Sequence, residues 1–180
     1  GYLELKTMAE QERERVRERE TIPGAVYERA YETRGEFIER GKNGVVVVRD
    51  ADRDWELCRQ GLIKPYLIQD QFPDTALQDW WVFVHDIRKE SGKHRHQGGL
   101  VLYVVEGRGA TEVNGEVVEW EEGDLILLPL HPEGIEHKHY NRDAGGSAKW
   151  LALIYLPVFD HVSSELTQTE VAPDYQARYD

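Results

Sequence analysis

The sequence predicts an all-β domain built as a sandwich or a barrel. From residue 80 to residue 158, short segments rich in β-branched and aromatic residues alternate with turn signals, spaced about eight to twelve residues apart as in all-β folds. Asn114-Gly115 separates two of these segments, and this dipeptide is the strongest short signal for a β-hairpin. The length of 180 residues suits one domain with its own core.

The first part of the chain has a different pattern. Residues 1–20 mix acidic and basic side chains, with opposite charges three residues apart, as in Glu10 and Arg13. Such pairs stabilise a helix by only about 0.2–0.5 kcal/mol each, so we expect an exposed helix that could dock on a partner subunit. Residues 25–37 are ambiguous. We therefore assign residues 1–40 to an N-terminal helical or extended segment.

Between this segment and residue 80 the signals are weaker. Asp50 or Asp52 could cap a short helix over residues 55–58. Strands are expected at 45–48 and 65–68, and a loop at 70–79.

The stronger strands follow. They are predicted at 80–87, 110–113, 116–120, 125–130, 135–140 and 149–158. We expect residues 41–163 to form the β-domain and residues 164–180 to be a polar, peripheral C-terminal tail.

Two histidines precede an apolar run that ends at Glu106-Gly107. His94 and His96 are two residues apart, so in a strand they point to the same face. Two imidazoles at that spacing can bind one metal ion. The alternative is that both are solvated at the end of a loop.

A second motif lies about thirty residues further along. Gly123 and Pro129 lead into Pro132, Gly134, His137 and Asn141. Together with the first motif, this pattern resembles the two signature motifs of the cupin superfamily, over roughly residues 80 to 157. The resemblance implies a double-stranded β-helix, the cupin jelly-roll barrel. The charge pattern of the first segment adds an N-terminal helical extension to it.

The first motif departs from the usual cupin pattern. The position of the usual glutamate ligand is occupied by Leu100, and no carboxylate lies between His96 and Glu106. Strand alternation places Leu100 on the inward face, where it would line the pocket. The resemblance therefore implies a metal site of three neutral histidines, His94, His96 and His137.

Other residues remain candidates for the site. His139 shares the face of His137 and is its rival as a ligand. His85 lies in step with Trp81 and Phe83 on the preceding strand, and all three could face the pocket. His85 would then be an acid, a base or an extra ligand; otherwise it is hydrogen-bonded in the core.

A missing carboxylate could also come from another segment. Glu133 lies on the loop before His137 and could replace it, whereas Glu136 should point away. His131 and His161 are expected at the surface. Cys58 is expected to be a small buried apolar residue.

Composition restricts the partners. The net charge of −12 argues against nucleic acid and against anionic membrane surfaces. No run approaches 18 apolar residues, as a membrane span requires. The single cysteine excludes an internal disulfide, and no signal-peptide pattern follows Gly1. We therefore expect a cytoplasmic protein, and a homodimer is possible.

Three neutral ligands leave a divalent metal with its full double positive charge, which favours an anionic, chelating substrate. Because the protein fills only three coordination positions, a chelating substrate still leaves room for O2. Within cupins, three-histidine sites resemble those of gentisate-type, β-diketone and thiol dioxygenases, and this motif looks most like the gentisate-type group. The resemblance therefore implies an iron(II) enzyme that cleaves a C–C bond of a small phenolic or dicarbonyl acid. Zinc, manganese, nickel or copper remain possible. The alternatives are a non-oxidative isomerase, decarboxylase or lyase, and a ligand-binding cupin without catalysis.

Overall fold

The computed structural model describes residues 23–69 and 71–178 of the chain. The helix expected over residues 1–20 lies outside these ranges. The chain divides into two compact units, residues 1–44 and residues 45–180.

The described part of the first unit is one helix, α2 (Val26–Asn43). It buries none of its side chains, and it ends where the Gly44 amide bonds to the Arg40 carbonyl at 2.8 Å. The sequence had left residues 25–37 open between helix and extended chain, and the structure shows helix from Val26 onward, after Ala25 in extended conformation. No helix within the described ranges is long and apolar enough to cross a membrane.

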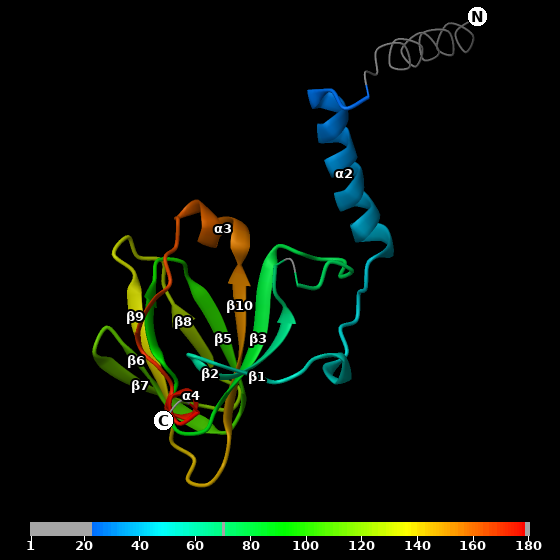
Figure 1. Cartoon of the computed structure of the whole chain (residues 1–180). Coiled ribbons are helices and arrows are strands. Elements are labelled where there is room, and N and C mark those ends of the chain that lie inside the picture. The colour runs from blue at the N-terminus through cyan, green and yellow to red at the C-terminus, as the bar shows by residue number, and fades with distance from the viewer. Residues whose placement is uncertain (1–22, 70, 179–180) are drawn as a thin grey trace, which may run out of the picture. The chain divides into compact units, whose positions relative to one another are not determined.

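The second unit consists mainly of two antiparallel sheets that face each other (Figure 1). In spatial order, the six-stranded sheet contains β1 (Glu56–Cys58), β2 (Gly61–Leu67), β3 (Trp80–Ile87), β10 (Ala148–Tyr155), β5 (Leu100–Glu106) and β8 (Leu125–Leu128). The five-stranded sheet contains β11 (Thr167–Glu170), β4 (Lys93–His96), β9 (Ile135–Asn141), β6 (Arg108–Val113) and β7 (Glu116–Glu121). The short helices are η1 (Asp50–Asp52), α3 (Leu156–His161) and α4 (Pro173–Gln176). The predicted all-β fold is confirmed.

Three local predictions are wrong. Of the strand expected at 45–48, only an isolated bridge from Val45 to Thr75 forms. The helix expected over residues 55–58 is instead strand β1, because its residues pair with the start of β2. The expected peripheral tail contains β11, which pairs with β4. In the last two cases strand pairing outweighs the local signal, with the neighbouring β2 for β1 and with the distant β4 for β11.

The core lies between the two sheets and follows the alternation of each strand. On β5, Leu102 and Val104 are buried while Tyr103 between them is exposed. On β10, Trp150 and Ala152 point inward in the same way. The two sheets thus enclose an apolar interior, and the histidines of β4 and β9 project into it.

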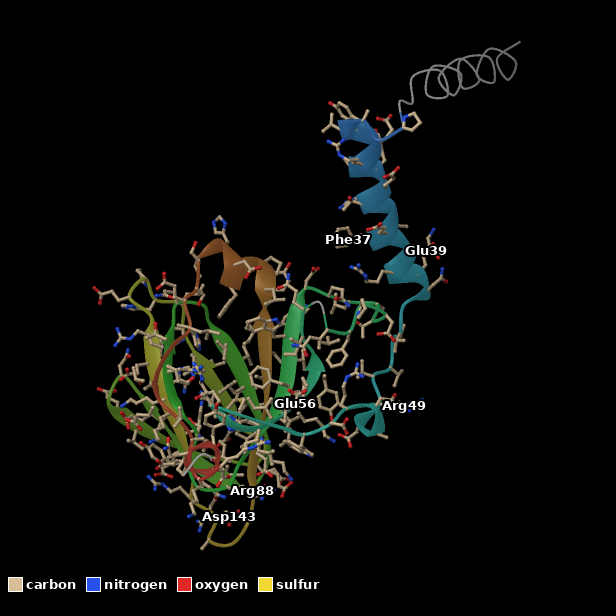
Figure 2. All side chains as sticks on the ribbon, viewed as in Figure 1. Phe37, Glu39, Arg49, Glu56, Arg88 and Asp143 are labelled. Carbon is tan, nitrogen blue, oxygen red and sulfur yellow. The ribbon has the colours of Figure 1, made fainter. Side chains whose placement is uncertain are left out.

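The site strands β4 and β9 are adjacent and antiparallel, with His94 opposite His137. Asn141 ends β9 and fixes its position. Its amide group donates to the carbonyls of Ile87 and Arg88, and its oxygen accepts from the Asp143 amide at 2.6 Å. Figure 2 labels Arg88 and Asp143 at this same end of the sheets. The cupin-motif asparagine therefore joins both sheets to a loop.

Thr111 on β6 connects two buried polar groups of the core. The Trp120 indole donates to the Thr111 hydroxyl at 2.9 Å, and the hydroxyl lies 2.8 Å from Nδ1 of His139. Thr111→Val keeps the shape and leaves both partners unpaired, so we expect a loss of about 1–3 kcal/mol in the free energy of unfolding. Urea denaturation measures it. Thr111→Ser should restore most of the loss, and exposed Thr167→Val is the control; an unchanged Thr111→Val protein would contradict the assignment.

Candidate metal centre

Three histidines from two adjacent strands converge in the interior. One ring nitrogen from each of His94, His96 and His137 lies within 4.8 Å of the others. Nε2 of His94 and Nε2 of His137 are only 2.9 Å apart. Two nitrogens in adjacent coordination positions, each about 2.1 Å from one ion, lie about 3 Å apart. The spacing therefore matches a shared metal ion.

Backbone carbonyls orient two of the rings. Nδ1 of His96 lies 2.8 Å from the Gly98 carbonyl, and Nδ1 of His137 lies 3.4 Å from the Ile135 carbonyl. A carbonyl only accepts hydrogen bonds, so Nδ1 carries the proton and Nε2 is left with its lone pair. This arrangement is typical of metal-ligating histidines.

One of these nitrogens is unpaired. Nε2 of His96 is buried and has no hydrogen-bond partner. A buried polar atom without a partner costs about 1–3 kcal/mol, and native proteins rarely leave one without a reason. A metal ion bound between the three rings would satisfy this nitrogen.

The environment keeps the rings neutral, which is the form that binds metals. Burial lowers the pKa of His94 to about 3, with the neighbouring His96 and His85 adding to the effect. Burial likewise lowers the pKa of His96, and it holds the pKa of His137 well below its usual value. The donor set is thus three neutral imidazoles with no carboxylate, and it fits a divalent metal site.

The two other buried histidines lie nearby and have other partners. His139 is bonded to Thr111, as described above, and its ring centroid is 5.3 Å from that of His137. His85 is fully buried and hydrogen-bonds to the backbone of Gln60; burial lowers its pKa to about 3. Neither belongs to the three-histidine cluster. His131 and His161 are exposed, as expected.

The two glutamates near His137 take no part in the cluster. Glu133 is exposed, and its carbonyl accepts a bond from Arg95. Glu136 faces away from the interior and forms an ion pair with Lys93 at 3.6 Å. Neither therefore takes the place of the missing glutamate.

A cavity of about 610 Å³ opens beside the cluster, with His94 and His96 in its wall. The predicted pocket residues Leu100, Trp81 and Phe83 also line it. Most of its surface is apolar, contributed in addition by Leu57, Ile154, Phe159 and Leu166. A cavity of this size suits a small organic ligand.

Several lining residues were not singled out from the sequence. Arg59 brings a positive charge, and Gln60 lies next to His94, with its Nε2 3.3 Å from the imidazole Nε2. Gln168 reaches the cavity from β11, in the segment expected to be peripheral. Cys58, which was expected to be buried, is instead half-buried at the cavity wall. No local motif marks these positions, because they reach the site only through strand pairing.

Comparison with known proteins agrees with this geometry. Residues 82–154 match the family model described as a cupin domain. The chain contains a cupin domain. A gentisate 1,2-dioxygenase from Haloferax sp. is 35% identical over 74 residues, which is 41% of this chain and 19% of that protein. The chain thus matches about a fifth of the length of this relative.

Two solved structures that resemble this chain in fold are proteins of different kinds. A variant of Streptomyces PAC13 solved with uridine gives a TM-score of 0.52 at 14% identity, covering 71% of this chain and 94% of that one. Vicilin from Corylus avellana gives 0.51 at 15% identity, covering 67% of this chain and 35% of that one. These likenesses support the cupin fold alone, because one fold can carry many activities.

Proposed function

We propose that this cupin binds one iron(II) ion through His94, His96 and His137. It would use O2 to cleave a C–C bond of a small phenolic or dicarbonyl acid. The observation that carries the proposal is the cluster of three neutral histidines, one with an unpaired buried nitrogen, beside an apolar cavity. Iron(II) in such a site would supply the chemistry that activates O2.

The charge of the site favours an anionic substrate. Three neutral ligands do not offset the charge of a divalent ion, and Arg59 adds a cation to the cavity wall. A substrate carboxylate would be attracted by both. The partial sequence likeness to gentisate 1,2-dioxygenase points to the same class of compound.

The apolar wall would bind the rest of the substrate. Trp81 packs against Phe159 with ring centroids 5.6 Å apart, and Phe159 lies 5.8 Å from the ring of His96. These rings would hold a planar substrate beside the cluster and exclude water from it.

The test is oxygen uptake by protein loaded with iron(II) under argon. We expect O2 consumption, matched by loss of substrate absorbance, with gentisate or another member of a panel of phenolic and dicarbonyl acids. His137→Ala protein treated identically is the control and should consume none.

Two results would contradict the oxygenase. Turnover of the same substrate under argon would indicate a non-oxidative isomerase, decarboxylase or lyase. Metal binding with no product from any member of the panel would indicate a binding protein without catalysis.

A further inference from the structure

Gln60 belongs to the turn between β1 and β2, outside both cupin motifs, yet its side chain reaches the metal centre. Its Nε2 lies 3.3 Å from Nε2 of His94, the nitrogen that also approaches His137. The two contacts place the end of the Gln60 side chain at the edge of the coordination site.

The orientation of the Gln60 amide is fixed by Gln168 of β11. The Gln168 nitrogen is surrounded by three oxygens: Oε1 of Gln60 at 2.8 Å, the Glu170 carbonyl at 2.6 Å and the Lys93 carbonyl at 3.3 Å. The carbonyls can only accept, so this atom of Gln168 must be its donor nitrogen. Oε1 of Gln60 is therefore the acceptor of this bond, and its NH2 group faces His94.

The Gln60 backbone is held as firmly as its side chain. Its carbonyl accepts from the Gly92 amide at 3.0 Å, and the fully buried His85 also hydrogen-bonds to its backbone. A side chain at Gly92 would collide with the amides of both Gln60 and Gln168. The Gln60 amide is thus preorganised, as site residues need to be.

The lone pair of His94 decides what this amide can do. An imidazole nitrogen has one lone pair, and once that lone pair binds a metal it no longer accepts a hydrogen bond. The Gln60 N–H then needs another acceptor, and the acceptors in that place are the other ligands of the metal.

We propose that Gln60 donates a hydrogen bond to an anionic ligand bound at the three-histidine centre. Gln168 and His85 are positioning residues that aim this donor. The inference rests on the proposed metal site. It adds a group that would orient the substrate, the Gln60 amide, which lies on the turn between β1 and β2 and is held by Gln168 of β11. It does not depend on which reaction follows.

The test uses the full chain loaded with cobalt(II), whose visible absorption reports its ligands, and azide as the anionic probe. Gln60→Met keeps the length of the side chain and removes the donor. We expect full cobalt content and azide affinity about tenfold weaker, as for loss of one hydrogen bond to a charged group. Gln168→Ala should weaken azide binding less, because the donor remains but is no longer aimed.

A second substitution covers the case in which Gln60→Met does not fold. Gln60→Glu retains a polar side chain of the same shape but offers an acceptor with negative charge, so azide affinity should fall further than in Gln60→Met. Gln71→Ala, an exposed glutamine on the loop before β3, is the matched control and should bind azide like the wild type.

The outcomes separate this inference from the proposed function. Wild-type azide affinity in Gln60→Met, or loss of cobalt from it, overturns the donor role. A wild-type protein that binds no divalent metal overturns both proposals. A protein that binds metal, shows the Gln60 effect and never consumes O2 supports this inference and contradicts only the oxygenase.

Discussion

His96→Ala should abolish metal binding, with affinity at least about 100-fold weaker than in the wild type. The His96 Nε2 atom is buried, unpaired and oriented by the bond of Nδ1 to the Gly98 carbonyl, so no neighbouring group can take its place. Losing even an outer partner of a ligand typically costs 10–100-fold. Each protein is dialysed against a fixed concentration of the free metal ion, and mass spectrometry then measures the metal that stays bound. His137→Ala should lose metal to the same extent as His96→Ala.

Thermal unfolding gives an independent readout of the same site. Metal at about 100 times its dissociation constant should stabilise the wild type by about 2.7 kcal/mol, and the shift should vanish in His96→Ala. The exposed His131→Ala is the control and should keep both metal content and shift. Stoichiometric metal in both His96→Ala and His137→Ala would refute the three-histidine site.

Deleting residues 165–180 should destabilise the β-domain and damage the metal centre. The deletion removes β11 from the edge of β4, the strand that carries His94 and His96. It also removes Glu170, whose carboxylate forms a salt bridge at 2.6 Å with the buried Lys138. We expect a loss on the order of 3 kcal/mol from these hydrogen bonds, lowering the melting temperature by about 10 °C.

Differential scanning calorimetry tests this deletion, and point variants separate its causes. Glu170→Ala should reproduce part of the destabilisation. It should not affect the donor at Gln60, because the backbone carbonyl of residue 170 remains and still accepts the hydrogen bond from Gln168. Arg178→Ala, exposed within the same segment, should melt like the wild type. A truncated protein with wild-type melting temperature and metal content would show that the segment is peripheral after all.

The fold class and the three candidate ligands could be predicted from the sequence. Strand alternation and two motifs in the right order were enough, because the side-chain direction in a strand has a period of two residues. That period places His94 and His96 on one face of β4, and it sends Arg95 and the paired Glu136 to the other. Leu100 reaches the same interior from β5 of the opposite sheet. Asn114-Gly115 likewise specified its hairpin, where both residues have positive φ.

The groups that complete the site could not be predicted, because they meet only in the folded chain. Residues 56–58 and 167–170 have weak local signals. Their strands form because β2 and the distant β4 offer them unpaired edges. These two strands bring Gln60 and Gln168 to His94, at positions that no motif marks. The histidine pattern is local and can be read from spacing, whereas the groups around it depend on contacts between residues more than a hundred positions apart.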